Sequence, residues 1–396
     1  MSDLNPDVRF FQTELAKKFP SLNLGIYIHI PFCVEKCPYC DFISGPIGRS
    51  QQDKYLETLS CEILESPFRN TPVETLFFGG GTPSEMQNHR ISELMKILHD
   101  CFDLSQVKEA TIECNPGTLT LEKLACFEQA GFNRISLGAQ SFNDMHLRKL
   151  GRIHTAENIF EAHKMICQAG FQNVNLDLMF GLMEQTLEEF KSDLDSSLKL
   201  EPQHLSLYHL TIEKGTPYFD KVQSGQLRPV DENLASQMLQ HACSKLTQSG
   251  YHQYEISNFA LRNKQCQHNQ KYWSNSATLG FGVSASSYIG GVRWTNTRAL
   301  NDYLTSASSR RVPLEIFEEL PPRAALGEEM MLGLRTDKGL DLDLVSKKYG
   351  LDAKSIFSKE LQEFERLKLL SRHGSKIKLT LQGLFLADSL CAEFLE

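Results

Sequence analysis

Hydrophobic residues alternate along this chain between short β-branched runs and longer stretches with helical periodicity. The short runs predict strands at Leu24–Ile30, Glu74–Phe78, Glu109–Cys114, Arg134–Ala139, Asn173–Met179 and His204–Leu210. Helical patterns are centred on residues 51–65, 88–101, 120–130, 155–170, 185–199 and 231–249. Strands that alternate with helices are typical of a parallel sheet with crossover helices. The pattern therefore predicts an α/β fold, a partial (β/α)6 TIM-like barrel that stays open.

The pattern changes before and after this predicted barrel. An apolar face formed by Phe10, Phe11, Leu15 and Phe19 predicts a helix ahead of it. The segment 302–322 is polar and ends at Pro321-Pro322, which is typical of a linker. The predicted organisation is a helical extension (1–22), the barrel (23–258), a motif segment with a linker (259–322) and a small, mainly helical, winged-helix-like domain (323–396).

Composition narrows the class of function. The formal net charge is −8 and no basic run occurs, which argues against nucleic-acid binding. No apolar stretch is long enough to cross a bilayer. The first residues, Met1 to Asp7, lack the basic and apolar regions of a signal peptide. We therefore expect a cytoplasmic protein.

Three of the eleven cysteines lie close together, directly after the first predicted strand. Cys33, Cys37 and Cys40 have C-x3-C-x2-C spacing. A structural zinc site would need a fourth ligand, and no second pair of cysteines is present. A thioredoxin-type motif would leave Cys33 unused. Three thiolates can instead hold three irons of a [4Fe–4S] cluster, which leaves the fourth iron open to a small molecule.

Distinctive residues also follow the other predicted strands. These segments are Gly79–Ser84, Glu113–Gly117, Gly138–Phe142 and 177–181. The carboxyl ends of strands in full and partial barrels face one side of the fold, where active sites form. We therefore expect these segments to surround the cysteine loop.

The cysteine spacing, followed by an aromatic residue and by Gly79–Thr82, resembles the radical S-adenosylmethionine (SAM) superfamily. This resemblance implies that the open iron binds the amino and carboxylate groups of SAM. It also implies that an electron from the cluster cleaves SAM to methionine and a 5′-deoxyadenosyl radical, chemistry that belongs to the cofactor.

Seven further segments are similar to the coproporphyrinogen III dehydrogenase branch, the oxygen-independent coproporphyrinogen oxidases. They are Tyr27–Cys33, Phe78–Ser84, Glu113–Thr118, Arg134–Phe142, Asn175–Gly181, Ser206–Thr211 and Tyr254–Ala260. The resemblance implies that the first SAM is bound by Tyr27, Tyr39, Gly80 and Glu113. The positions that match a second SAM site are Gly81, Thr82, Gln140, Arg152 and Asp177. No residue is assigned a catalytic role.

Two departures separate this chain from the dehydrogenases. Phe42 stands where they carry a fourth cysteine, and the segment before the first strand is short. Both features resemble HemW-type haem chaperones, which also carry His-Asn-x-x-Tyr-Trp, here His268–Trp273. The resemblance implies a haem site of His268, Tyr272 and Trp273, because imidazole ligates haem iron and aromatic rings stack on porphyrins. A packed loop is the alternative for His268, and a free thiol is favoured for Cys266.

The leading hypothesis is therefore a haem chaperone that keeps a SAM-binding [4Fe–4S] site and passes haem to acceptor proteins such as respiratory enzymes. An alternative is oxidative decarboxylation of coproporphyrinogen III to protoporphyrinogen IX. A third reading is a radical enzyme that acts on another substrate.

Overall fold

The computed structural model describes residues 8–309 and 312–395 of the chain. Its centre is a curved sheet in which six parallel strands pair in sequence order. These strands are β1 (Leu24–Ile30), β2 (Val73–Gly80), β3 (Glu109–Cys114), β4 (Arg134–Gln140), β5 (Val174–Phe180) and β6 (His204–His209). The predicted partial (β/α)6 barrel is confirmed: β1 and β3 have the predicted bounds, and the ends of the other four strands differ from the predicted ones by at most two residues.

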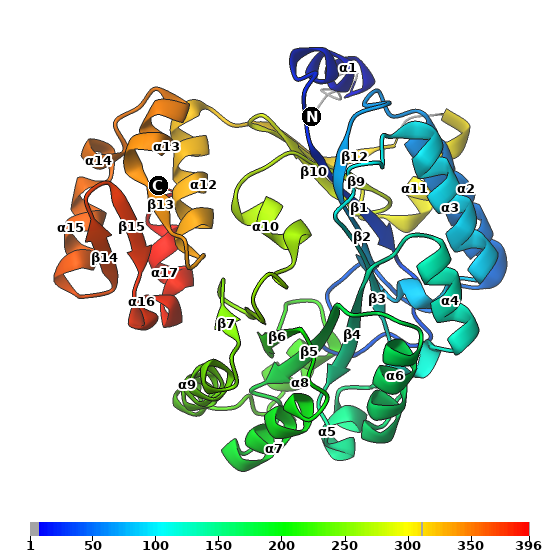
Figure 1. Cartoon of the computed structure of the whole chain (residues 1–396), viewed down its shortest axis with the longest axis horizontal. Coiled ribbons are helices and arrows are strands. Elements are labelled where there is room, and N and C mark those ends of the chain that lie inside the picture. The colour runs from blue at the N-terminus through cyan, green and yellow to red at the C-terminus, as the bar shows by residue number, and fades with distance from the viewer. Residues whose placement is uncertain (1–7, 310–311, 396) are drawn as a thin grey trace.

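Helices cover the outer face of the curved sheet (Figure 1). They are α2 (Arg49–Leu64), α3 (Asn88–Cys101), α4 (Leu121–Gln129), α6 (Ala156–Gln168), α7 (Leu187–Leu198) and α9 (Glu232–Gln248). The short helices α5 (Asp144–Lys149) and α8 (Pro217–Gln223) lie by the cysteine loop, where Tyr218 of α8 hydrogen-bonds the carbonyls of Pro38 and Lys149. Thr155 and Thr186 begin α6 and α7 with capping boxes, which satisfy backbone N–H groups that the helix leaves free. Gly131 and Gly170 follow α4 and α6 with positive φ, as expected for residues that end helices.

Further strands extend the sheet at both edges to twelve strands. Beyond β1 lie β9 (Thr278–Phe281), β10 (Ser286–Ile289), β11 (Val292–Asn296) and β12 (Leu314–Glu319), and beyond β6 lie β8 (Asn258–Ala260) and β7 (His252–Gln253).

The expectation of a linker up to residue 322 was wrong. That stretch contains most of α11 (Leu300–Ser309) and all of β12, whose Glu319 pairs with Val292 of β11. As an edge strand, β12 is exposed along much of its length, so its polar sequence resembles a linker.

Two short helices lie near the ends of this sheet. Helix α1 (Val8–Lys18) places Phe11 edge-on against Phe317 of β12. Residues 1–7 of the predicted extension lie outside the described residues. Helix α10 (Gln267–Trp273) connects β8 to β9 and therefore passes across the open side of the barrel, as Figure 1 shows. The motif His268–Trp273 lies on this helix.

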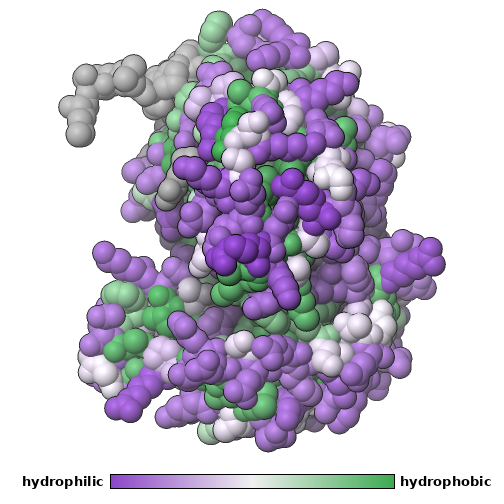
Figure 2. Space-filling view, turned by 90° about the vertical axis from the view of Figure 1, so that its left-hand side faces the viewer, coloured by the Kyte–Doolittle hydropathy of each residue, from purple (hydrophilic) through white to green (hydrophobic). Residues whose placement is uncertain are grey.

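The C-terminal unit has a hydrophobic core of its own that includes Leu326, Phe357 and Phe394. Its helices are α12 (Pro322–Leu334), α13 (Leu342–Tyr349), α14 (Ala353–Ile356), α15 (Ser358–Arg366), α16 (Leu381–Phe385) and α17 (Ala387–Ala392). A small sheet of β13 (Leu340–Asp341), β15 (Lys376–Leu379) and β14 (Leu370–His373) completes a winged-helix-like unit. Figure 2, viewed from this side, shows a mostly hydrophilic surface with separate small hydrophobic areas. Within the described residues, no helix is long and apolar enough to cross a membrane.

Candidate functional site

A cavity of about 430 Å³ opens at the carboxyl ends of the parallel strands. It is lined by most of the residues predicted to bind the cluster and SAM, namely Cys33, Cys37, Tyr39, Cys40, Gly80, Gly81, Thr82, Glu113, Gln140, Arg152 and Asp177. Most of these residues come from the cysteine loop and from the carboxyl-terminal halves or ends of β2, β3, β4 and β5, as the barrel topology predicts, whereas Arg152 lies between α5 and α6.

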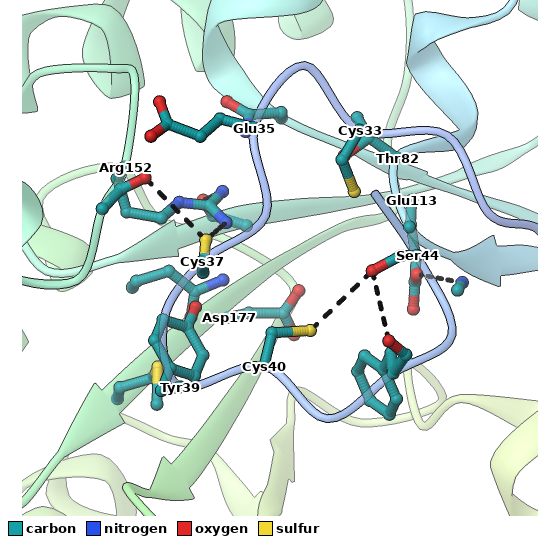
Figure 3. Close-up of a pocket in the computed structure, with 18 of the residues that line it drawn as sticks. Cys33, Glu35, Cys37, Tyr39, Cys40, Ser44, Thr82, Glu113, Arg152 and Asp177 are labelled. Carbon is teal, nitrogen blue, oxygen red and sulfur yellow. Dashed lines mark hydrogen bonds between the residues drawn. The ribbon is translucent and has the colours of Figure 1, made fainter. Parts of the chain in front are cut away.

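The three cysteines of the loop lie around one space with their sulfur atoms turned toward it (Figure 3). The Thr82 hydroxyl donates to Cys33 Sγ at 3.7 Å, and Arg152 Nη1 donates to Cys37 Sγ at 3.7 Å. Cys40 Sγ lies 4.0 Å from the Ser44 hydroxyl. Such donors stabilise a thiolate, which is the form that binds metal. Burial, followed by the charge of Cys37, raises the pKa of Cys33 and of Cys40, and a bound metal would favour their ionised form.

Three thiols on one loop can bind a polynuclear cluster. Across residues 8–309 and 312–395, no group of three or more His, Cys, Asp or Glu side chains is gathered as a single metal ion requires. In a cubane cluster each cysteine binds a different iron, so the three sulfur atoms need not meet at one point. The open loop with three inward thiols therefore fits a [4Fe–4S] cluster.

Glycines at the end of β2 bring its backbone close to the cysteine loop. The N–H of Gly81 donates to the Ile30 carbonyl at 2.8 Å, and the N–H of Thr82 donates to the Phe32 carbonyl at 2.6 Å. A Cβ on Gly81 would lie 2.7 Å from the Phe32 carbonyl oxygen and 2.9 Å from that of Ile30. Because both oxygen atoms belong to the backbone, neither can move away from such a Cβ without displacing the loop.

Replacing Gly81 by alanine is expected to displace the cysteine loop and to weaken SAM binding by roughly tenfold or more, since backbone approach without a Cβ is lost. Equilibrium binding of SAM to the reconstituted protein measures this effect. Gly117→Ala is the matched control, because a Cβ there would meet nothing closer than 3.9 Å. Equal SAM affinity in both variants would show that this approach of β2 to the loop is unimportant.

Two half-buried carboxyl groups, those of Glu113 and Asp177, line the inner wall of the cavity. Glu113 Oε2 accepts a hydrogen bond from the N–H of Gly80 at 3.1 Å. Asp177 accepts hydrogen bonds from Asn175 Nδ2 at 2.8 Å and from Ser136 Oγ at 3.1 Å. Burial, followed by the charge of Asp177, raises the pKa of Glu113 to about 8. A positively charged ligand would stabilise the ionised carboxylates, and SAM carries a sulfonium and an ammonium group.

Tyr27 lies beneath the cavity, and it is held by a residue that the sequence analysis did not single out. Its hydroxyl lies 3.0 Å from His29 Nδ1, while His29 Nε2 lies 2.9 Å from the carbonyl of Ile43 beyond the third cysteine. His29 therefore connects the first strand to the far end of the cysteine loop. The alternation of Tyr27-Ile-His29 placed both side chains on one face of the strand, and that signal was available in the sequence.

The haem-motif residues come together on α10, away from the cysteine cavity. Glu109, the first residue of β3, accepts hydrogen bonds from the N–H groups of Gln267 at 2.9 Å and of His268 at 3.1 Å. It also accepts one from Cys266 Sγ at 3.4 Å. Since α10 also packs on Gly25, near the start of β1, it lies toward the amino ends of the strands. Cys266 is a buried, free thiol.

His268 is fully buried, and both of its ring nitrogens have partners. Nδ1 lies 2.8 Å from Thr75 Oγ1, and Nε2 lies 2.9 Å from the Tyr272 hydroxyl. The ring also stacks on Phe77. Burial, then the charges of Lys271 and Arg134, lower its pKa to about 3. The imidazole is therefore neutral at pH 7, as a metal ligand must be, but Tyr272 has to release Nε2 before that nitrogen can bind iron.

Comparisons with known proteins agree with this geometry. A family model described as the radical SAM superfamily matches residues 27–196, and one described as the HemN C-terminal domain matches residues 320–386. The heme chaperone HemW of Bacillus subtilis (strain 168) is 35% identical over 372 residues, which cover 93% of this chain and 98% of that protein. The heme chaperone HemW of Escherichia coli (strain K12) is 39% identical over 273 residues, 68% of this chain and 70% of that one.

A solved structure shares the whole architecture. It is described as coproporphyrinogen III oxidase (HemN) from Escherichia coli, a radical SAM enzyme. The TM-score is 0.85 at 27% sequence identity, and the match covers 96% of this chain and 92% of that chain. The similarity therefore extends beyond the barrel to the C-terminal unit.

Proposed function

Because the chain belongs to the HemW family of the radical SAM superfamily, we propose that it is a haem chaperone that keeps a SAM-binding [4Fe–4S] site and passes haem to acceptor proteins. The observation that carries the proposal is Phe42 at the mouth of an otherwise SAM-like cavity. Phe42 is 60% exposed and lines the cavity beside Cys40. The position that holds a fourth cysteine in the dehydrogenases therefore offers an apolar ring, which suits a porphyrin face.

In this proposal Cys33, Cys37 and Cys40 would hold the cluster, and SAM would bind its open iron. Gly80 presents its backbone and Glu113 its carboxylate to that SAM, with Tyr27 and Tyr39 beside it. The cluster supplies a single electron when it is reduced. The protein's part is to orient SAM and to exclude water, and burial of Glu113 and Asp177 is consistent with an interior site.

His268 is proposed as a haem ligand on α10, with Tyr272 and Trp273 as flat neighbours. Tyr272 is 40% exposed and Trp273 is partly exposed, so a porphyrin has access to both rings. Ligation requires α10 to release the imidazole from Tyr272. We also propose that the haem acceptors include respiratory enzymes and that the protein acts in the cytoplasm.

Coproporphyrinogen III oxidation is the second candidate, and a specific observation favours it. All five positions that match a second SAM site, Gly81, Thr82, Gln140, Arg152 and Asp177, line the same cavity. Arg152 Nη2 also donates to the Gly138 carbonyl at 3.1 Å, which holds its guanidinium at the cavity wall.

An activity assay separates the two candidates. The full chain with a reconstituted cluster is given SAM, a reductant and coproporphyrinogen III under anaerobic conditions. The proposal expects no protoporphyrinogen IX beyond the level found without SAM. Formation of vinyl groups over many turnovers would establish the enzyme instead of the chaperone.

A further inference from the structure

The mouth of the cysteine cavity has an apolar rim that the cluster and SAM residues do not use. Val34, Phe42 and Ile153 line this cavity while 54%, 60% and 46% of their surfaces stay exposed. Val34 lies between Cys33 and Cys37 on the loop, Phe42 follows Cys40, and Ile153 follows α5. Apolar side chains at the open end of a polar cavity are unfavourable in water and favour an apolar ligand that covers them.

An exposed histidine lines the same cavity. This residue, His209, ends β6. Its ring packs on Phe180, with the ring centroids 5.2 Å apart. On the other side lies Gly181, where φ is +69° and where a Cβ would come within 2.5 Å of His209 Cδ2. The imidazole is therefore held in a fixed place by its neighbours.

The nitrogens of this imidazole are not engaged. Within the described part of the chain, no hydrogen bond to a ring nitrogen of His209 is present, although its backbone takes part in the pairing of β5 with β6 and its carbonyl accepts a hydrogen bond from the Thr211 hydroxyl. Partial burial also lowers the pKa of His209, so the neutral form predominates at pH 7. A neutral, positioned and accessible imidazole has the properties that a metal ligand needs, and His268 in its buried site lacks access.

We propose that the cavity mouth is a second haem site, in which His209 ligates the haem iron and Val34, Phe42 and Ile153 contact the porphyrin. This inference rests on the proposed function as a haem chaperone. The second site lies over the cluster loop, at the other end of the barrel from His268. Haem can reach it without any movement of α10. Coordination replaces a water on the iron by an imidazole nitrogen and needs no electron transfer.

Haem titration in a background without the α10 ligand tests this site. Ferric haem is added stepwise to the cluster-reconstituted His268→Ala protein. The haem absorption band and the haem concentration at half-saturation are recorded. We expect a histidine-ligated spectrum to remain. Adding His209→Ala should remove that spectrum and weaken haem binding by about tenfold or more, the scale of a lost axial ligand. His99→Ala, at an exposed histidine of α3 outside the cavity, is the matched control.

Two further variants distinguish ligation from a structural effect. His209→Met is expected to keep haem but to shift its spectrum, because a thioether can replace imidazole on haem iron. Phe42→Ala, at an exposed side chain, is expected to weaken binding by about tenfold through lost apolar contact while leaving the spectrum unchanged. A His209→Ala spectrum and affinity equal to those of the His99→Ala control would overturn the second site alone. Failure of the wild-type chain to bind haem would overturn the proposed function itself.

Discussion

Replacing Cys37 by alanine is expected to leave fewer than four irons in the anaerobically reconstituted protein and to abolish SAM binding at the cluster. The loop supplies only three thiols, so loss of one removes a third of the protein's ligands to the cluster. Cys37 also accepts a hydrogen bond from Arg152 Nη1. Iron and sulfide analysis, together with the electron paramagnetic resonance signal of the reduced protein, measures the outcome.

Cys61→Ala is the control for this experiment. Cys61 is an exposed free thiol on α2, outside the cysteine loop. We expect this variant to bind the same amount of iron as wild type. A Cys37→Ala protein that keeps four irons and a SAM-sensitive signal would refute the assignment of the loop.

Replacing His268 by alanine is expected to remove the haem that binds at α10. The same change leaves Thr75 and Tyr272 without their shared partner and opens a space against Phe77. Loss of a buried partner typically costs about 1–3 kcal/mol of folding free energy. Urea unfolding measures this cost, and haem titration followed through the absorption band measures the loss of ligation.

Thr75→Val separates ligation from stability. It removes the hydrogen bond to His268 Nδ1 and keeps both the imidazole and the shape of the site. We expect this variant to be destabilised as well and yet to bind haem as wild type does. If both variants lose haem equally, the effect of His268→Ala comes from altered packing of α10, and the imidazole is not a ligand.

Local sequence patterns were sufficient to predict the barrel and most of the residues that line the cysteine cavity. Strand order followed from alternation, because a chain that alternates strands and helices has few ways to form a parallel sheet. The positions at strand ends then came together because all parallel strands end on the same side. Edge strand β12 was missed, since its exposed polar residues carry no hydrophobic alternation.

The burial of His268 and its hydrogen-bond partners could not be predicted from the local sequence. Its Nδ1 partner Thr75 is 193 residues away, and Glu109, which fixes the start of α10, is 159 residues from it. For the histidine beside Tyr272 and Trp273 the sequence left two readings, a haem ligand and a packed loop, and the fold buries the imidazole. The accessible His209 was overlooked for the opposite reason: it lies in a strand segment that matched the family, and nothing in its neighbourhood marked its nitrogens as free.

Transfer of haem by the reconstituted full-length chain tests the central claim most directly. The protein is loaded with haem under anaerobic conditions, separated from free haem and mixed with an apo haem protein, while the absorption bands of both are followed. The account predicts saturable loading and movement of haem to the acceptor, with the iron–sulfur cluster intact. A chain that holds its cluster and SAM but neither binds haem nor delivers it would contradict the account.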